Sequence, residues 1–366
     1  MFKHAQVGKY KMKKSFVSIL AILFLAFSNI TPTLSLSNSQ VLHASGSIEY
    51  LYDTHSTDDN GRLHVSGNNI INEYGQQVQL IGVNYQFICW YWGSYGCPRN
   101  AAQYEYMADW GCNVVRLAVQ FGYFSEDVLD SLEQQVEWAA NNGIYAVLAT
   151  NYGGGSQHME TWNEADFTNW KSIWTQIATR FSGNTNVLYK IWGEPCGLTA
   201  SQYQARTREC IDAIRAIDPD VIIIVDGLHY SSWMDIGLNF EQTNPISRDN
   251  LIFDISKYYN DDSWGYSTSS LISRFNSYGI TWCLNNNRAF WIAEFNYLTD
   301  AWGSFPGCPN NGPTWMRNTM EYCNEIGAVG YAAWTWTVKA GDPFYLIQNW
   351  YGTPSESGLV LQEGLS

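Results

Sequence analysis

The chain has 366 residues, of which 46% are hydrophobic and 15% charged, and its formal net charge at pH 7 is −14. This apolar content is ample for a large core and excludes a wholly disordered chain. The acidic balance argues against a nucleic-acid partner, because nucleic-acid phosphates attract clusters of Lys and Arg. The chain also contains 17 Trp and 24 Tyr, and flat rings in that number favour a surface that stacks on sugar rings.

A leader is predicted at the amino terminus. Its first residues are basic, and an apolar run from Phe16 to Phe27 precedes small and polar residues. This order is typical of a secretory signal, and the run is shorter than the roughly 20 residues of a membrane-spanning helix. We therefore expect residues 1–45 to be a leader cleaved between Ser35 and Ser45, a secreted protein, and no stable membrane span after cleavage. An uncleaved leader that anchors the protein at the cell surface is the alternative.

Residues 46–366 contain no internal repeat or linker, so we expect one domain. It opens with a predicted β-hairpin, in which turns at Asn68-Asn69 and Tyr74-Gly75 separate short alternating stretches. Eight short apolar strands then alternate with helical segments. Such strands are typical of a parallel sheet covered on both faces, and eight units favour a closed barrel over an open sheet. The predicted fold is a single α/β domain, a (β/α)₈ TIM barrel.

The expected strands are Gln79–Val83, Val114–Val119, Tyr145–Thr150, Val187–Trp192, Val221–Val225, Leu251–Ile255, Phe290–Ala293 and Gly330–Trp334. The expected helices are Ala101–Trp110, Glu126–Asn141, Phe167–Phe181, Ala200–Ile217, Ser269–Tyr278 and Pro313–Ile326. The chain after Trp334 is polar and irregular to Ser366, which predicts a stunted last crossover.

Eight Cys in an exported chain permit disulfide bonds but do not prove them. The candidate pairs are Cys89 with Cys97, Cys308 with Cys323, and Cys283 with either of the last two. Cys112 lies in an apolar passage from helix to strand, which favours a buried free thiol. No spacing of the Cys residues matches a zinc site.

Two glutamates lie where barrel enzymes place their chemistry, at the carboxyl ends of the strands. Glu194 follows the fourth predicted strand and Glu294 ends the seventh, each beside Trp or Phe. A carboxylate there loses solvation and needs a partner or a chemical role. In a facing pair, one carboxyl with a raised pKa can protonate a glycosidic oxygen while the ionised one attacks the anomeric carbon. An ion pair with an Arg at the barrel mouth is the alternative for each glutamate.

Five passages carry a family resemblance. They are Gly82-Val83-Asn84, Gly111-Cys112-Asn113-Val114-Val115-Arg116, Trp192-Gly193-Glu194-Pro195, Trp291-Ile292-Ala293-Glu294-Phe295 and Trp334-Thr335-Trp336. Together they resemble glycoside hydrolase family 5, a family of retaining β-glycanases on (β/α)₈ barrels, over nearly all of residues 63–336. The resemblance implies a cellulase-like or mannanase-like endo-β-glycanase that acts on a β-linked glycan. We expect it to use no cofactor and no metal, and to be a monomer.

The resemblance also implies roles for individual residues. Glu194 matches the acid/base of the family and Glu294 its nucleophile. Arg116 would orient Glu294, and Tyr258, shortly beyond the sixth predicted strand, would donate a hydrogen bond to it. Trp334 would form the platform under the sugar that is cleaved.

Three positions depart from the family pattern. Gly193 replaces the usual Asn before the acid/base, Asn151 replaces a His at the end of the third strand, and Ser256 replaces a second His. Loss of the Asn side chain removes a hydrogen bond to the sugar 2-hydroxyl, a contact of a kind that supplies roughly several kcal/mol in the transition state. Asn151 still donates and accepts hydrogen bonds, so we expect it to contact substrate, although it cannot titrate as His does.

Aromatic side chains follow several predicted strand ends. As a set they favour stacking platforms whose ring faces meet sugar C–H groups, although burial explains any one of them as well. They are Trp90, Tyr91, Trp92, Tyr95, Tyr152, Trp162, Trp264 and Trp302.

The sequence thus predicts a secreted β-glycan hydrolase and leaves two rivals. A catalytically inactive carbohydrate-binding barrel would keep the aromatic lining without a paired carboxylate geometry. A structural cell-envelope protein would have no connected cleft at the strand ends. Cellulose, mannan, xylan and mixed-linkage glucan all suit an aromatic groove.

Overall fold

The computed structural model describes residues 40–42, 48–50, 61–88, 97–120, 124–151, 161–228, 246–277, 279–301, 305–308, 310–339 and 342–365. The chain divides into two compact units, Met1–Asp53 and Thr54–Ser366. In the first unit, the described residues form an antiparallel pair of strands, β1 (Gln40–Leu42) and β2 (Ile48–Tyr50). The second unit contains all the other described elements.

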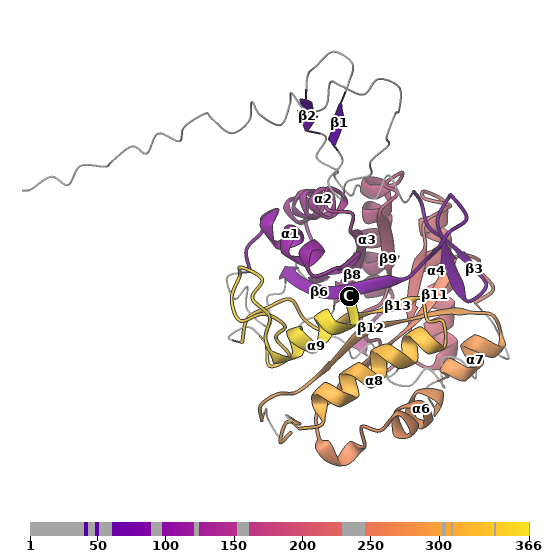
Figure 1. Ribbon diagram of the computed structural model, residues 1–366. Helices are drawn as coiled ribbons and strands as arrows, with labels where there is room; N and C mark the ends of the chain where they lie inside the picture. Colours follow the sequence, from indigo (N-terminus) through magenta and orange to yellow (C-terminus); the bar gives the residue numbers. More distant parts are fainter. Residues whose placement is uncertain are drawn as a thin grey trace, which may run out of the picture. The chain divides into compact units, whose positions relative to one another are not determined.

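Eight parallel strands close into a barrel in the second unit, in the order β10-β11-β12-β13-β6-β7-β8-β9 (Figure 1). They are β6 (Leu80–Ile88), β7 (Val114–Gln120), β8 (Tyr145–Asn151), β9 (Val187–Lys190), β10 (Ile223–Asp226), β11 (Leu251–Tyr259), β12 (Ala289–Tyr297) and β13 (Gly330–Ala333). Each overlaps one predicted strand, so the predicted (β/α)₈ barrel is confirmed. The strands are apolar on both faces because side chains fill the barrel on one side and helices cover the other.

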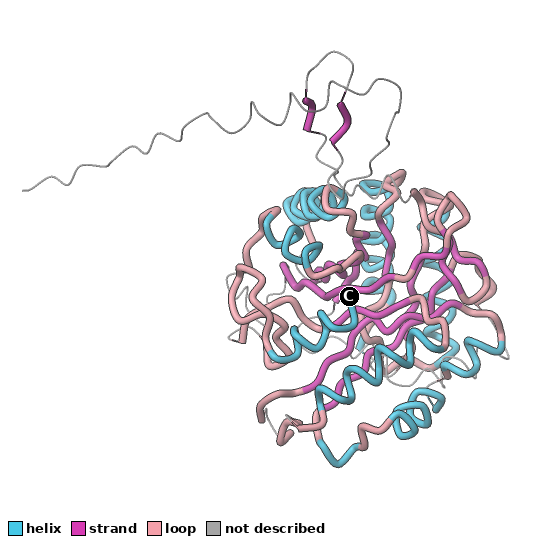
Figure 2. The backbone as a smooth tube through the Cα atoms, in the orientation of Figure 1, coloured by secondary structure: helices cyan, strands magenta, loops and turns pink. Residues whose placement is uncertain are grey.

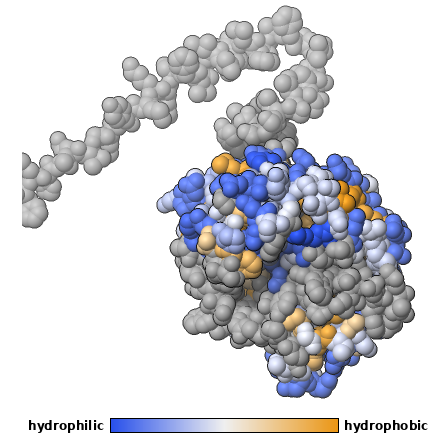
Figure 3. All heavy atoms as spheres, turned by 90° about the horizontal axis from the view of Figure 1, so that it is seen from below, coloured by the Kyte–Doolittle hydropathy of each residue, from blue (hydrophilic) through white to orange (hydrophobic). Residues whose placement is uncertain are grey.

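Helices alternate with the strands and surround them (Figure 2). They are α1 (Ala102–Asp109), α2 (Glu126–Ala140), α3 (Glu164–Phe181), α4 (Ala200–Arg215), α6 (Thr268–Ser277), α7 (Ile280–Asn285), α8 (Gly312–Glu325) and α9 (Glu356–Leu365), with a 3-10 turn η3 (Asp262–Trp264). All six predicted helices are present, whereas α7 and α9 were not predicted. On the face shown in Figure 3, hydrophobic residues occur as separate small patches among hydrophilic ones.

The chain forms helix α9 near its end, so the prediction that it is irregular from Trp334 to Ser366 is wrong there. The two glycines of α9 are poor helix formers, which hides the helix in the sequence. Packing creates it instead, because Val360 and Leu361 are buried in the core. A Cβ atom at Gly358 would lie 2.1 Å from the carbonyl oxygen of Leu346, so only glycine allows this close approach.

A small antiparallel sheet precedes the barrel. It consists of β3 (His64–Ser66), β4 (Asn69–Ile71) and β5 (Gln77–Val78), which confirms the predicted hairpin and adds a third strand. Its buried Leu63 and Ile70 pack in one cluster with the first residues of the barrel strands, among them Leu80 and Val114. The sheet therefore covers the amino-terminal end of the barrel and leaves the carboxyl ends of the strands for a site.

Three of the candidate disulfide pairings are wrong. Cys308 and Cys323 are free thiols, which rules out a bridge between them and a bridge from Cys283 to either. The Cys308 thiol lies 2.8 Å from the carbonyl oxygen of Tyr259, to which it donates. Cys323 belongs to helix α8 and is buried in the core. The spacing of Cys residues in a sequence does not show which thiols meet in the fold. Cys112 is a buried free thiol, as predicted, and burial raises its pKa to about 12.

The bridge between Cys89 and Cys97 stays a prediction, because Cys89 lies outside the described residues.

Candidate active site

Glu294 and Tyr258 lie within long strands rather than at or beyond their ends. Strand β11 continues to Tyr259 and β12 to Tyr297, and their pairing shifts register between Ile255 and Ser256. Irregularities of this kind re-aim side chains and are common beside active sites. The sequence prediction ended both strands too early because polar residues follow the apolar runs, although those polar residues are largely buried here.

The carboxylate of Glu294 is held from two sides. Its side chain is almost wholly buried. One oxygen, Oε1, accepts a hydrogen bond of 2.6 Å from the Arg116 guanidinium, and the other, Oε2, accepts one of 2.7 Å from the Tyr258 hydroxyl. The guanidinium is fully buried and supplies the counter-charge. Glu294 is therefore fixed in orientation, with Arg116 and Tyr258 in contact with it, as expected from the sequence.

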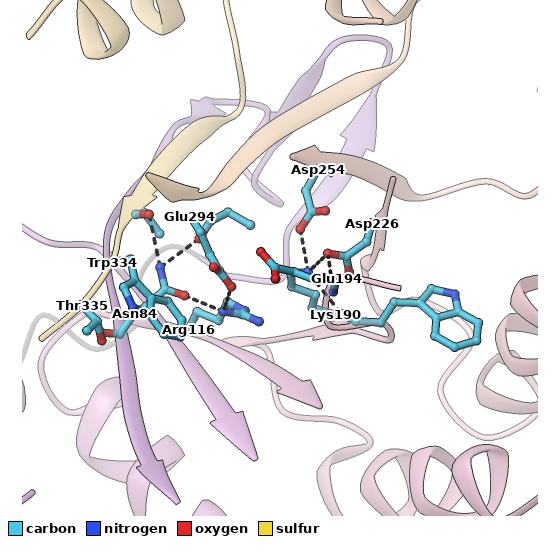
Figure 4. Close-up of polar contacts among 12 residues, drawn as sticks. Asn84, Arg116, Lys190, Glu194, Asp226, Asp254, Glu294, Trp334 and Thr335 are labelled. Carbon is cyan, nitrogen blue, oxygen red and sulfur yellow. Dashed lines mark hydrogen bonds and ion pairs between the residues drawn. The ribbon is translucent and has the colours of Figure 1, made fainter. Parts of the chain in front are cut away.

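Asn84 supports this arrangement, and the sequence analysis gave it no role. Its Oδ1 accepts a hydrogen bond of 2.8 Å from Arg116, and its Nδ2 donates to the carbonyl oxygen of Ala293 at 2.9 Å (Figure 4). Its own carbonyl oxygen accepts from the Thr335 hydroxyl and from the backbone N–H of Trp336. Asn84 thus joins β6, β7, β12 and the chain after β13. Its place at the end of the Gly82-Val83-Asn84 passage was the available signal.

Glu194 follows β9 and is half-buried. Its backbone has a φ of 54°, in the left-handed region that residues other than glycine rarely adopt. Burial and the charges of Glu294 and Asp226 raise the pKa of Glu194 to about 8, against the lowering effect of Lys190 and Arg116. In Figure 4 the carboxyl groups of Glu194 and Glu294 face one another. One carboxyl that keeps its proton at neutral pH therefore lies opposite one that is ion-paired.

Behind Glu194 lies a buried charged cluster that the sequence analysis missed. It consists of Lys190, Asp226 and Asp254, whose side chains are fully buried. The Lys190 ammonium forms an ion pair with Asp226 and lies 3.0 Å from a carboxyl oxygen of Asp254. A charged residue inside an apolar strand run was the available signal, since buried charges require partners.

Trp334 directly follows β13 and is 8% exposed. Its indole N–H donates to Oδ2 of Asp342 at 3.2 Å, and Oδ1 of Asp342 accepts the backbone N–H of Phe344 at 2.8 Å. The Arg116 guanidinium lies 6.0 Å from the centre of the Trp334 ring. Burial raises the pKa of Asp342 to about 6. Asp342 was missed because it lies in the stretch predicted to be irregular.

The three departures from the family pattern are described to different extents. Asn151 ends β8, where its backbone pairs with that of Gln120; its side chain is outside the described set. Ser256 is buried and pairs in register with Glu294, and its hydroxyl has no hydrogen-bond partner within the described part of the chain. Gly193 is buried immediately before Glu194.

Among the aromatic residues predicted to line a cleft, Trp162 is described. It packs on the core with its ring 5.2 Å from that of Phe167, which fits the burial alternative. Trp264 lies in η3, with its side chain outside the described set. The others are also outside it: Trp90, Tyr91, Trp92, Tyr95, Tyr152 and Trp302.

In the described ranges, no group of three or more His, Cys, Asp or Glu residues is arranged to hold a metal ion. A (β/α)₈ barrel with two facing carboxyls at the carboxyl ends of its strands fits the carboxyl pair that glycoside hydrolases use.

Comparison with known families gives the same class. The family model for cellulase (glycosyl hydrolase family 5) matches residues 71–340. The chain belongs to this family of glycoside hydrolases, and the resemblance inferred from the sequence is confirmed.

Curated relatives are endoglucanases. An endoglucanase of Clostridium saccharobutylicum is 25% identical over 337 residues, which cover 89% of this chain and 64% of the relative. Endoglucanase E-5 of Thermobifida fusca is 26% identical over 209 residues, which cover 53% of this chain and 41% of the relative. The chain thus spans about two fifths to two thirds of the length of these relatives.

Solved structures share the fold. A β-glucanase from Saccharophagus degradans, crystallised with cellotetraose, matches with a TM-score of 0.69 at 18% identity, covering 84% of this chain and 93% of that one. The catalytic domain of Thermobifida fusca endoglucanase Cel5A matches with a TM-score of 0.66 at 19% identity, covering 84% and 98%.

Proposed function

We propose that this protein hydrolyses internal β-glycosidic bonds of a β-glucan, with retention of the anomeric configuration. The observation that carries the proposal is the facing pair of carboxyls, in which Glu294 is held by Arg116 and Tyr258 while Glu194 has a pKa of about 8. The names of the relatives, endoglucanase and β-glucanase, favour a glucan over mannan or xylan.

In the first step, the Glu294 carboxylate attacks the anomeric carbon and forms a bond to it. The bond from that carbon to the glycosidic oxygen breaks, and Glu194 gives its proton to the departing oxygen. The fixed orientation of Glu294 reduces the reorganisation needed for attack. The products are a covalent glycosyl-enzyme and a shortened glucan with a free hydroxyl.

In the second step, the ionised Glu194 takes a proton from water as the water oxygen attacks the anomeric carbon. The bond to Glu294 breaks, and its carboxylate returns to Arg116 and Tyr258. Two inversions at one carbon give net retention. Trp334 and Asn151 are proposed substrate contacts, the first through ring stacking and the second through hydrogen bonds.

The test is release of reducing ends by the purified protein from cellulose, mixed-linkage β-glucan, mannan and xylan. We expect release from a β-glucan, and loss of at least about a thousandfold in kcat for Glu294→Gln, because the nucleophile is removed. Glu321→Gln changes an exposed glutamate on α8 and is the matched control, with unchanged kcat. Binding of glucan without release by the wild-type protein would support the carbohydrate-binding alternative instead.

We further propose that residues 1–45 act as a cleavable leader and that the remainder, 46–366, is exported as a monomer. The basic start and the short apolar run support export. No described helix combines the length and apolar character of a transmembrane span. Amino-terminal sequencing of protein recovered from culture medium, with light scattering for its mass, tests both points; recovery with the membrane fraction would favour the anchored alternative.

A further inference from the structure

The cluster of Lys190, Asp226 and Asp254 has no part in the two steps above. Three ionisable side chains without solvent contact are costly unless their charges balance. Burial and the charge of Asp226 raise the pKa of Asp254 to about 8. At neutral pH Asp254 therefore keeps a proton, and Lys190 with Asp226 forms one buried ion pair.

This ion pair contacts the backbone turn that carries Glu194. The Lys190 ammonium donates to the carbonyl oxygen of Trp192 at 3.1 Å, and Oδ1 of Asp226 lies 3.5 Å from the backbone nitrogen of Glu194, whose N–H it accepts. The two contacts lie on either side of Gly193, which has no side chain with which to fix the turn. The Asp254 carboxyl group lies 3.0 Å from the Lys190 ammonium, and among the described contacts none joins its side chain directly to residues 192–194.

The turn is also anchored from its outer side. The Trp192 ring stacks on that of Trp170, with the ring centres 4.0 Å apart, and its indole N–H donates to Thr207 at 2.9 Å. The Tyr203 hydroxyl donates to the carbonyl oxygen of Asp226. A non-glycine residue at positive φ, such as Glu194, persists only where its surroundings hold it. Lys190 and Asp226 provide that hold on the side facing the barrel interior.

We propose that Lys190 and Asp226 are positioning residues for Glu194: they hold the turn at residues 192–194 and place a fixed negative charge beside the Glu194 carboxyl. This inference rests on the proposed role of Glu194 as proton donor. Because Asp226 touches the turn and Asp254 does not, the two aspartates should differ in their effect on Glu194 although both pair with Lys190.

Several groups act on Glu194 in addition to Asp226. Burial and Glu294 raise its pKa as Asp226 does, and the two cations Lys190 and Arg116 lower it. Strand β11 contributes two further groups that interact with it electrostatically, Lys257 and Tyr258. Removal of the Asp226 charge leaves all these groups in place. It also removes one cause of the raised pKa of Asp254, so Asp254 can ionise and become the counter-ion of Lys190, farther from the turn that carries Glu194.

The experiment compares Asp226→Asn with Asp254→Asn. Each change removes one fully buried carboxyl that pairs with Lys190, and Asn at 226 keeps an acceptor for the Glu194 N–H. Loss of the Asp226 charge lowers the pKa of Glu194. We therefore expect the basic limb of kcat/KM to move to lower pH by on the order of one unit in Asp226→Asn. In Asp254→Asn we expect this limb to stay where it is.

A second readout requires no activity. The Glu194 carboxyl is titrated by NMR in protein labelled with ¹³C at glutamate Cδ, and its signal is assigned through Glu194→Gln. In each variant we expect the pKa of this carboxyl to shift as the basic limb of kcat/KM does. Equal shifts in both aspartate variants, or none in Asp226→Asn, overturn the inference. If the wild-type protein cleaves no β-glucan while the NMR titration moves only in Asp226→Asn, the proposed function fails and the effect of Asp226 on Glu194 stands.

A double variant covers the case in which Asp226→Asn does not fold. Lys190→Met with Asp226→Asn removes both charges and leaves no unpaired ion, a change that buried sites commonly tolerate. Because the turn loses the Lys190 contact to the Trp192 carbonyl oxygen and the negative charge beside Glu194, we expect kcat to fall about tenfold or more with little change in KM. A kcat within about twofold of wild type would overturn the inference.

Discussion

The two oxygens of Glu294 receive their hydrogen bonds from different strands, Oε1 from Arg116 on β7 and Oε2 from Tyr258 on β11. Strand β12 alone therefore does not fix the carboxylate. Asn84 extends the same network to β6 through Arg116. At the scale of single residues, the site depends on hydrogen bonds that cross between strands, and each can be removed separately.

Tyr258→Phe removes one of these hydrogen bonds and keeps the ring. Hydrogen bonds to charged groups contribute about 1.5–3 kcal/mol, so we expect kcat to fall about ten- to a hundredfold while the fold is retained. Tyr297→Phe is the matched control, because Tyr297 is a buried tyrosine on the neighbouring strand β12 and its hydroxyl has no hydrogen-bond partner among the described residues. Steady-state kinetics measures both, and equal rates for the two variants would contradict the role assigned to Tyr258.

The segment between β13 and α9 is the element on which Trp334 depends. Asp342 holds the indole N–H, and Phe344 packs against Tyr258 with the ring centres 4.7 Å apart. One segment thus supports both the expected sugar platform and a residue that binds Glu294.

Asp342→Ala releases the Trp334 indole. We expect KM for a glucan oligosaccharide to rise about tenfold or more, since a hydrogen bond to a charged acceptor contributes about 1.5–3 kcal/mol. Asp109→Ala, an exposed aspartate on α1, is the control and should leave KM unchanged. An unchanged KM in Asp342→Ala would mean that Trp334 does not bind the sugar or needs no support.

Helix α9 offers a test of packing at the scale of a single element. In Gly358→Ala the new methyl group would meet the Leu346 carbonyl oxygen and the Trp110 ring. We expect a loss of about 1–3 kcal/mol in the free energy of unfolding. Leu359→Ala changes the exposed neighbour and should stay within about 0.5 kcal/mol of wild type. Denaturant titration separates the two; a stable Gly358→Ala would show that α9 packs less closely than described.

At the scale of the whole molecule, the barrel buries acids whose pKa values are raised in the folded state. Burial is the largest cause for Glu194, Asp254 and Asp342, which have pKa values of about 8, 8 and 6. Between pH 4 and these values, the folded state binds more protons than the unfolded state, so stability falls as pH rises. Lys257, with a pKa lowered to about 7 by burial, opposes this trend only above pH 7.

We therefore expect the protein to be more stable at pH 5 than at pH 7 in denaturant titrations. Asp212 and Glu363, whose pKa values are lowered by Arg partners, act below this window. Asp254→Asn removes one of these raised acids and should reduce the difference in stability between the two pH values. A midpoint that rises from pH 5 to pH 7 would contradict the protonation assigned to the buried acids.

Most of the barrel was predictable from the sequence because its strands are buried on both faces and form continuous apolar runs. The ends of β11 and β12 were not, because Ser256, Lys257 and Glu294 are polar residues that are buried or half-buried by the site itself. Helix α9 was missed because packing, not helix propensity, forms it.

The candidate site was predictable where a residue's chemistry alone marks it, as for Glu194 and Glu294. Residues that act through partners were harder to find. Lys190, Asp226 and Asp254 come from three strands, and a sequence does not say which charges meet. The hydrogen bond from Trp334 to Asp342 depends in the same way on the course of the loop after β13, which the sequence does not show.

The most direct test of the central claim is ¹H NMR of the first sugar released from a β-1,4-linked glucose oligosaccharide. If Glu294 forms a glycosyl-enzyme and Glu194 serves as acid and then as base, the β-anomer must appear first, with the α-anomer growing later by mutarotation. Appearance of the α-anomer first would mean inversion and would contradict the double displacement assigned to this pair.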